Sequence, residues 1–177
     1  MTARVRDATP ADAPGIAHVH VTTWQNAYRG VLPPTHLDTL SVPLRTEFWA
    51  TFLADVPQRS RLHVAEDPAG EVLGFAGTCP TRDEDCDPDT TGEVAAIYVV
   101  DEHWGDGTGT ALLVAATEGL VGDGFTEATL WVLADNPRAH RFYEREGWVL
   151  DGEQRHEVYA DHRVVEVRYW RSLVDDG

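Results

Sequence analysis

The chain has 177 residues, of which 42% are apolar and 25% charged, so its size and composition suit one globular domain with a single core. Its 30 Asp and Glu residues against 14 Lys and Arg residues give a net charge of -16, which disfavours nucleic-acid binding, because that binding needs basic residues to neutralise phosphates. The charge suits a cationic partner such as an amine, although a solvated acidic surface is the simpler explanation, and Cys79 and Cys86 form neither a CxxC pair nor a zinc motif.

The chain begins with a short alternating strand around Val5 and a helix that follows Thr9, where a capping threonine and a first-turn proline mark a helix start. The apolar stripe of this helix includes His20, for which a core position is the simpler interpretation. The helix runs into the segment Trp24 to Pro33, WQNAYRGVLP, whose glycine and prolines force a loop. Trp24 and Tyr28 could line a substrate pocket there, or they could anchor the loop to the core.

Two helical segments, 35–40 and 43–55, come next, followed by an antiparallel hairpin with strands at 61–66 and 71–78. The loop 81–91 is rich in aspartate, and its alternating acidic residues resemble the start of a calcium loop. Thr90 stands where such a loop needs glycine, and the twelfth position is an alanine instead of glutamate. We therefore predict a mobile acidic loop, which could border a site for a cation, and no metal site.

The most informative segment joins an apolar strand at 92–100 to a glycine-rich loop and then a helix. Three glycines alternate directly before the helical pattern, at Gly105, Gly107 and Gly109. A strand, tight loop and helix start present free backbone N–H groups and the positive end of the helix dipole to one point. This segment therefore predicts a site for a phosphate or pyrophosphate.

The remaining elements place a second helix beside this loop. The strand 127–133 completes a parallel strand–helix–strand unit with the glycine-loop helix. Asn136 can cap a helix with a proline at its first position, and that helix ends at Gly147. Two strands, at 148–159 and 164–173, close the chain.

Two common phosphate-binding motifs do not fit the glycine loop. A Walker A loop needs a lysine after its second glycine, and none follows here. A dinucleotide-binding fingerprint is GxGxxG on the first strand of a doubly wound sheet, whereas this chain has GxGxG on a strand that follows an antiparallel hairpin.

The segment from Glu93 to Trp148 resembles the acyl-coenzyme A binding core of the GNAT superfamily of N-acetyltransferases. That core combines a glycine loop, usually R/Q-x-x-G-x-G/A, with a later N-x-x-A-x-x-F-Y-x-x-x-G-F/W. The second pattern matches at each fixed position, namely Asn136, Ala139, Phe142, Tyr143, Gly147 and Trp148. The first matches in its glycines, but Trp104 replaces the usual Arg or Gln and Asp106 adds a carboxylate. The WQNAYRGVLP segment also resembles the end of the first helix in many members.

This resemblance implies an α/β fold with a mixed, mostly antiparallel sheet, a central parallel strand pair splayed at the acyl-coenzyme A site, and helices on both faces. It also implies that acetyl-coenzyme A contacts residues of the central strand, the loop and the last helix, which are Tyr98, Val99, Val100, Trp104, Gly105, Asp106, Gly107, Thr108, Gly109, Thr110, Asn136, Ala139, Phe142, Tyr143 and Arg145. Because the loop binds mainly through backbone N–H groups, residue 104 need not be basic. The arginines at 138, 141 and 145 could reach a phosphate or could be ordinary surface charges.

The catalytic roles also follow from the resemblance. Tyr143 would protonate the leaving thiolate, and its alternative role is packing beneath the cofactor. Glu93 would act as the base, directly or through water, because strand alternation puts it on the face of Ala95, Ile97 and Val99; otherwise it is a solvated strand-end carboxylate. The backbone N–H of Val99 would donate to the thioester oxygen. Trp24, Tyr28 and Glu93 would contact the acceptor.

We therefore expect residues 1–177 to form one acetyl-coenzyme A dependent N-acetyltransferase domain that modifies a small-molecule or peptide amine by direct attack. The alternatives are a coenzyme A binding module without catalysis and transfer of a longer acyl group. The N-terminus lacks a signal peptide and no stretch approaches the ~18 apolar residues of a membrane span, so we expect a cytoplasmic protein that contacts no membrane. A homodimer is left open.

Overall fold

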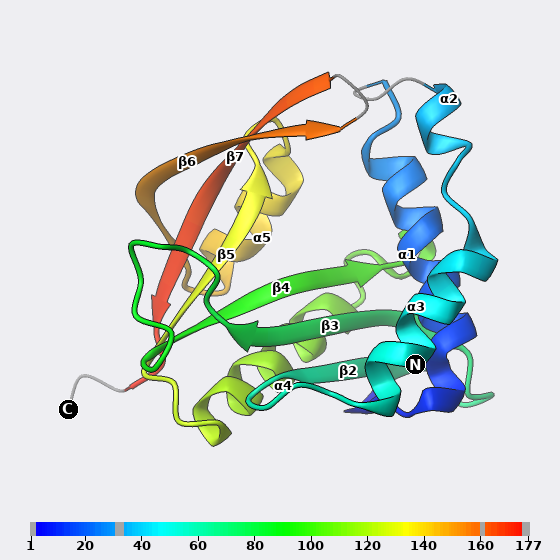
Figure 1. Ribbon diagram of the computed structural model, residues 1–177, viewed down its shortest axis with the longest axis horizontal. Helices are drawn as coiled ribbons and strands as arrows, with labels where there is room; N and C mark the ends of the chain where they lie inside the picture. The colour runs from blue at the N-terminus through cyan, green and yellow to red at the C-terminus, as the bar shows by residue number, and fades with distance from the viewer. Residues whose placement is uncertain (1–2, 31–33, 160–161, 175–177) are drawn as a thin grey trace.

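The computed structural model describes residues 3–30, 34–159 and 162–174, and every element predicted within those ranges forms, with its ends shifted by a few residues (Figure 1). The strands are β1 (Arg4–Asp7), β2 (Arg61–Glu66), β3 (Val72–Pro80), β4 (Thr91–Val99), β5 (Glu127–Leu133), β6 (Val149–Tyr159) and β7 (His162–Ser172). The helices are α1 (Ala13–Ala27), α2 (Pro34–Leu37), α3 (Val42–Ala54), α4 (Thr108–Gly122) and α5 (Pro137–Arg145). The predicted loop and turn residues 31–33 and 160–161 lie outside the described residues.

The strands form a seven-stranded sheet in the order β1-β2-β3-β4-β5-β7-β6, in which β4 and β5 are the parallel neighbours and the other pairs are antiparallel. The parallel pairing is short, because it extends from Thr91 opposite Glu127 only to Glu93 opposite Thr129. Beyond that point the two strands diverge, as Figure 1 shows. The predicted mixed sheet with a splayed central pair is therefore confirmed.

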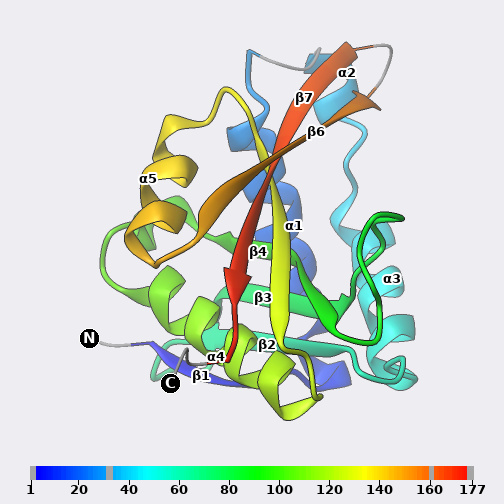
Figure 2. The same ribbon diagram turned by 90° about the vertical axis from the view of Figure 1, so that its left-hand side faces the viewer.

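Helices cover both faces of the sheet (Figure 2). On one face, α1 and α3 pack over β2 and β3, with Ile16, Trp49 and Phe75 in the buried core. On the other face, α4 packs over β2, β3 and β4, and α5 packs beside β7, with Leu112, Tyr143 and others in a second core. We call these the α1 face and the α4 face, because the site uses both.

A β-bulge in β4 decides which of its side chains point to which face. Gly77 of β3 lies opposite Ala96, but the next residue, Thr78, lies opposite Val94, so Ala95 is an extra, exposed residue. The bulge puts Val94 on the α4 face together with Ile97 and Val99. Glu93 precedes Val94 and hence points to the α1 face. The prediction that Glu93 shares a face with Ile97 and Val99 is wrong, because simple alternation overlooks the inserted residue.

His20 has the structural role that its position on the apolar stripe predicts. Its Nδ1 accepts a hydrogen bond from the indole of Trp49 at 3.2 Å, and its ring stacks on Tyr98. Burial, together with the nearby charge of Arg45, lowers the pKa of His20 to about 4. The imidazole is therefore neutral at physiological pH. In the described ranges, no helix has the length and apolar character needed to cross a membrane.

Candidate active site

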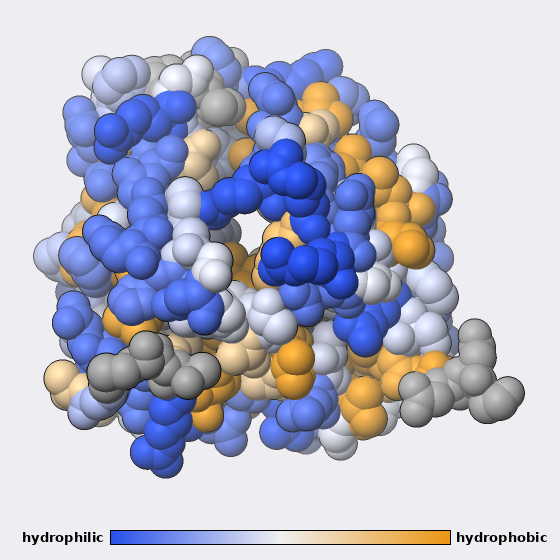
Figure 3. Space-filling view, turned by 180° about the vertical axis from the view of Figure 1, so that it is seen from behind, coloured by the Kyte–Doolittle hydropathy of each residue, from blue (hydrophilic) through white to orange (hydrophobic). Residues whose placement is uncertain are grey.

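A cavity of about 780 Å³ lies where β4 and β5 separate. Its walls come from both strands, the glycine loop, α5, the end of α1 and β7. In the space-filling view from behind, the surface has an opening rimmed largely by hydrophilic side chains, with apolar side chains deeper inside (Figure 3). The splay of the two strands therefore creates a site that side chains from both faces of the sheet can reach.

The glycine loop has the tight backbone and helix start that the sequence predicts. Gly105 and Gly107 have φ values of +83° and +97°, which residues with a Cβ rarely adopt, and Gly107 is the N-cap of α4. Among the described residues, the N–H groups of Gly105, Gly107, Gly109 and Thr110 have no hydrogen-bond acceptor. These N–H groups and the positive end of the α4 dipole fit an anionic group such as a pyrophosphate.

Asp106 does not point at this seat. Its carboxylate accepts the N–H of Thr108 at 2.9 Å and contacts the imidazole of His103 at 2.8 Å. These interactions, the backbone hydrogen bond first, lower the pKa of Asp106 to about 2. The carboxylate therefore caps α4, and neither Asp106 nor Thr108 lines the cavity.

Trp104, the residue that departs from the usual glycine-loop pattern, is paired with an arginine from α5. The guanidinium carbon of Arg138 lies 3.0 Å from the centroid of the indole, and both residues line the cavity. The indole N–H also donates to the carbonyl of Val99 at 2.7 Å. Arg141 and Arg145 line the same wall, so this end of the cavity is cationic.

The edge of β4 presents one residue's backbone to the gap. The Val100 N–H donates to Leu73 of β3, and Tyr98 lies opposite Phe75 in the same antiparallel register. Because backbone groups alternate sides along a strand, those of Tyr98 face β3 and those of Val99 face the gap. Val100 is hydrogen-bonded at its N–H and carbonyl and does not line the cavity. Tyr98 lines the cavity although its backbone groups face β3.

The helix α5 brings the residues of the second motif to the cavity. Asn136 caps α5 by accepting the N–H of Ala139 at 3.1 Å, and Asn136, Ala139, Phe142 and Tyr143 line the cavity wall. Tyr143 is buried against Phe142, Trp148 and Tyr169. Burial raises the pKa of its phenol, so the hydroxyl keeps its proton at neutral pH.

The end of the cavity on the α1 face is aromatic and carries a carboxylate. Tyr28 and Tyr98 line it, and Trp24 supports both by stacking on Tyr28 at 4.7 Å and donating to the Tyr98 hydroxyl at 3.0 Å. Trp24 itself lies behind the wall. Glu166 of β7 is the one carboxylate among the described lining residues, and its side chain is 9% exposed. The cavity thus has arginines at one end and, at the other, the carboxylate of Glu166, which is paired with Arg155.

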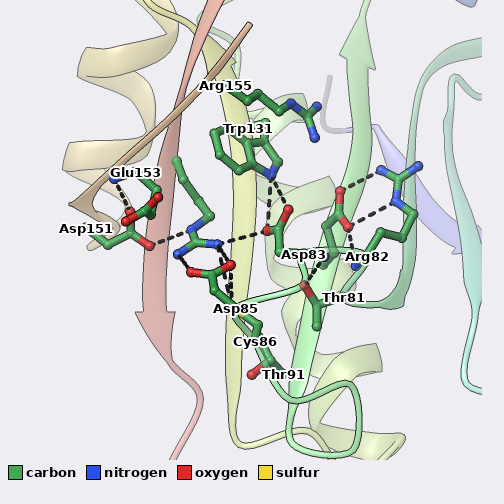
Figure 4. Close-up of polar contacts among 12 residues, drawn as sticks. Thr81, Arg82, Asp83, Asp85, Cys86, Thr91, Trp131, Asp151, Glu153 and Arg155 are labelled. Atoms are coloured by element: carbon green, nitrogen blue, oxygen red, sulfur yellow. Dashed lines mark hydrogen bonds and ion pairs between the residues drawn. The ribbon is translucent and has the colours of Figure 1, made fainter. Parts of the chain in front are cut away.

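Glu93, the predicted base, is bound by an arginine and does not line the cavity. Its carboxylate is 2% exposed and accepts from Arg82 three times, from Nη2 at 2.6 Å, from Nε at 3.1 Å and from the backbone N–H at 3.2 Å (Figure 4). The prediction that Glu93 is a solvated strand-end residue is also excluded by its burial.

The acidic loop 81–91 binds a cation that the chain itself supplies. Arg168 of β7 donates to Asp83 at 3.2 Å, to Asp85 at 2.7 Å and to Asp151 at 2.6 Å (Figure 4). The hydrogen bond from Arg168 lowers the pKa of Asp85. Asp83, Asp85 and Cys86 are close enough to share a metal ion, but the Arg168 guanidinium already occupies the space between them. These contacts fix the loop that we expected to be mobile.

The structure thus brings the predicted cofactor residues together except Val100, Asp106 and Thr108, and of the predicted acceptor residues it brings Tyr28 alone to the cavity wall. Sequence reasoning left Arg138 undecided and missed Trp131 and Glu166, which also line the cavity. Neither of the missed residues belongs to a motif. Glu166 lies in an alternating strand, where an inward-facing glutamate between valines was the available signal.

Comparisons with known proteins agree with this geometry. The model of the acetyltransferase (GNAT) family matches residues 21–148. The uncharacterized N-acetyltransferase YuaI of Bacillus subtilis is 35% identical over 133 residues, which are 75% of this chain and 73% of that protein. The L-methionine sulfoximine/L-methionine sulfone acetyltransferase of Pseudomonas paraeruginosa is 29% identical over 86% of this chain and 84% of its own length.

Solved structures show the same fold. A GNAT superfamily phosphinothricin acetyltransferase from Sinorhizobium meliloti, determined in complex with acetyl-coenzyme A, superposes with a TM-score of 0.72 at 22% identity and covers 97% of this chain and 89% of its own. The chain belongs to the GNAT family of acetyltransferases and is an acyltransferase whose acyl donor is acetyl-coenzyme A.

Proposed function

We propose that this enzyme transfers an acetyl group to a primary amine of a small molecule or peptide by direct attack of the amine on the thioester. The observation that carries the proposal is one continuous cavity with arginines at one end and a carboxylate that has a free oxygen at the other. Arg138, Arg141 and Arg145 lie at the end that meets the glycine loop, and Glu166 lies at the end on the α1 face. An anionic donor and a cationic acceptor would be attracted to opposite ends.

Acetyl-coenzyme A supplies the thioester, and the chain supplies its orientation. The glycine-loop N–H groups and the start of α4 would hold the pyrophosphate, and Arg138 would add a charge-assisted hydrogen bond. The Val99 backbone, which faces the gap, would pair with the pantetheine arm once its carbonyl is released by Trp104. Asn136 would contact the same arm with the amide nitrogen that helix capping leaves over.

Two groups would assist the bond changes at the thioester. The Val99 N–H would donate to the thioester oxygen as that oxygen gains negative charge. Tyr143 would hydrogen-bond the departing thiolate and give it a proton, since burial keeps the phenol protonated at neutral pH. Both groups come from the walls that meet where β4 and β5 separate.

Two carboxylates are candidates for removing the proton of the ammonium. Glu93 would need Arg82 to leave before it could meet an acceptor, since three hydrogen bonds hold it. Glu166 lines the cavity and is bound on one side only, through Oε2, by Arg155. The geometry favours Glu166 as the group that receives the acceptor ammonium, and it favours Glu93 as a structural ion-pair partner that orders the loop beside the site.

The names of relatives are consistent with amine acceptors of small size. The Pseudomonas relative is named for L-methionine sulfoximine and L-methionine sulfone, and the Sinorhizobium structure for phosphinothricin. Each of these compounds carries a primary amine. We extend to this chain only the transfer to an amine.

The test is a thiol-release assay with acetyl-coenzyme A and a broad panel of amines, run beside calorimetry with coenzyme A. We expect binding of coenzyme A and thiol release with a subset of the panel. Binding without thiol release for any amine would instead support a coenzyme A binding module that lacks catalysis, and absence of binding would refute both functions.

A further inference from the structure

Arg155 of β6 is built like an anion receptor next to the acceptor end of the cavity. Its Nε is bound by Glu166 at 2.6 Å and contacts Glu157 at 3.5 Å. Neither Nη1 nor Nη2 makes a hydrogen bond to any residue in the described ranges. The side chain is 35% exposed. One edge of the guanidinium is thus fixed, and the two outer nitrogens remain available as donors.

The guanidinium rests on a platform that is itself fixed. Its carbon lies 4.4 Å from the centroid of the Trp131 indole, and Trp131 lines the cavity. The indole N–H of Trp131 is shared by both oxygens of Asp83, at 3.1 and 3.2 Å, and Asp83 is in turn held by Arg168. In Figure 4 the Arg155 side chain lies over Trp131 and reaches toward the gap between β5 and β4.

The neighbouring carboxylate, that of Glu166, is suited to bind a cation. Glu166 lies directly across from Arg155 in the β6–β7 ladder, so both side chains are on the α1 face. Glu166 also lies close enough to Tyr28, Tyr98 and Tyr159 to contribute, after burial, to raising the pKa values of their phenols. Oε2 of Glu166 is occupied by Arg155, and no second hydrogen bond to this carboxylate is seen within the described residues. The Arg155 guanidinium and the Glu166 carboxylate therefore lie side by side, and each has hydrogen-bonding atoms that no described residue uses.

We propose that this pair recognises a zwitterion, so that the acceptor is an amino acid or a close analogue with a free carboxylate beside its amine. The carboxylate would bind Nη1 and Nη2 of Arg155, which present the parallel donors that a carboxylate accepts best. The amine would bind the free oxygen of Glu166 and lose its proton there before attacking the thioester. This inference rests on the proposed function, since it names the acceptor of the same reaction.

Placement distinguishes this arrangement from an ordinary cross-strand ion pair. A pair that only stabilised the hairpin would gain nothing from a cavity beside the carboxylate or from an aromatic platform beneath the guanidinium. Arg168, two residues after Glu166, shows what a structural arginine looks like here, because it is 6% exposed and donates through all three of its nitrogens. Arg155 instead keeps its outer nitrogens unused.

The test compares acceptors that differ only at the carboxylate. The twenty common L-amino acids are assayed first as acceptors, and the best of them is then compared with its own amide and with the amine that lacks the carboxyl group. We expect the free acid to have a kcat/KM at least about tenfold above both, which is the scale of one charged hydrogen bond. In Arg155→Gln this preference should vanish through KM, while coenzyme A affinity stays unchanged.

Two further variants keep the test decisive. Arg155→Lys retains a positive charge beside Glu166 but lacks the two parallel N–H donors of a guanidinium. This variant should fold and still lose most of the preference for the free acid. Arg163→Gln, at an exposed position on the same hairpin, should retain it. Wild-type enzyme that accepts the amide as well as the acid, or either Arg155 variant keeping the preference, would overturn the zwitterion and leave the acetyltransferase standing. If none of the amines tested caused thiol release, the function and the inference would both be refuted.

Discussion

Arg138 should be a main source of affinity for coenzyme A, although it comes from α5 and not from the glycine loop. Its guanidinium carbon lies 3.0 Å from the centroid of the Trp104 ring, and it has no carboxylate within ion-pair distance among the described residues. Partial desolvation by the surrounding protein lowers its pKa, and the charge of Asp101 opposes that effect. Because stacking already restricts the Arg138 side chain, binding a phosphate costs it little further conformational entropy, so it should bind a phosphate well.

The magnitude follows from the interaction that Arg138→Gln removes. A hydrogen bond to a charged group contributes about 1.5–3 kcal/mol. Since every ~1.4 kcal/mol corresponds to a factor of ten in affinity, the Kd of coenzyme A should rise about ten- to a hundredfold. The side chain is exposed, so the free energy of unfolding should change by no more than about 0.5 kcal/mol.

Isothermal titration calorimetry with coenzyme A and with pantetheine separates this mechanism from a general distortion of the site. Pantetheine has no phosphates, so Arg138→Gln should leave its affinity unchanged. Arg163→Gln serves as the control for the lost charge. A Kd for coenzyme A within twofold of wild type, or an equal loss for pantetheine, would refute the phosphate role of Arg138.

Three further results are expected. Tyr143→Phe should lower kcat by roughly a hundredfold or more, as removal of a general acid does, with the coenzyme A Kd kept by calorimetry; an unchanged kcat would assign Tyr143 to packing alone. Glu166→Gln should lower kcat/KM for the amine far more than Glu93→Gln, which should mainly reduce the unfolding free energy by freeing Arg82; the reverse order in kinetics of folded variants would make Glu93 the base. Because the pKa of His20 in the folded chain, about 4, lies below the ordinary histidine value of 6.5, the unfolded chain binds more protons between those values. The contribution of neutral His20 to the free energy of unfolding should therefore be fully present above pH 6.5 and be lost as the pH drops toward 4. In urea unfolding, His20→Phe should show a shallower decline of that free energy over the same pH range.

Sequence patterns reached the elements and the cofactor end of the site because both depend on local features. Glycines with positive φ, a capping asparagine and a helix start are encoded within a few residues of each other. The family motif then places α5 next to the glycine loop. This is why Gly107, Asn136 and Tyr143 are found on the cavity wall where the sequence put them.

The acceptor end escaped prediction because it depends on register and on contacts between distant segments. One inserted residue, Ala95, moves Glu93 to the other face of the sheet, and nothing in the local sequence marks that bulge. Arg168 reaches the loop at Asp83 and Asp85 across more than eighty residues of chain. No periodicity could show that an arginine would fill the acidic cluster.

Trp104 is best understood together with Arg138, as a relocation of the positive charge that the family usually has in the loop. An arginine on a glycine-rich loop loses much side-chain freedom when it binds a phosphate, whereas an arginine stacked on an indole has already lost it. The indole also contacts the edge of β4, because its N–H donates to the Val99 carbonyl that the proposed pantetheine contact requires. A pantetheine arm that bonded to the Val99 carbonyl would have to displace the Trp104 indole, and that displacement would separate Arg138 from the ring. Under the proposed function, occupancy of the strand edge and availability of the phosphate-binding cation are therefore coupled through one side chain.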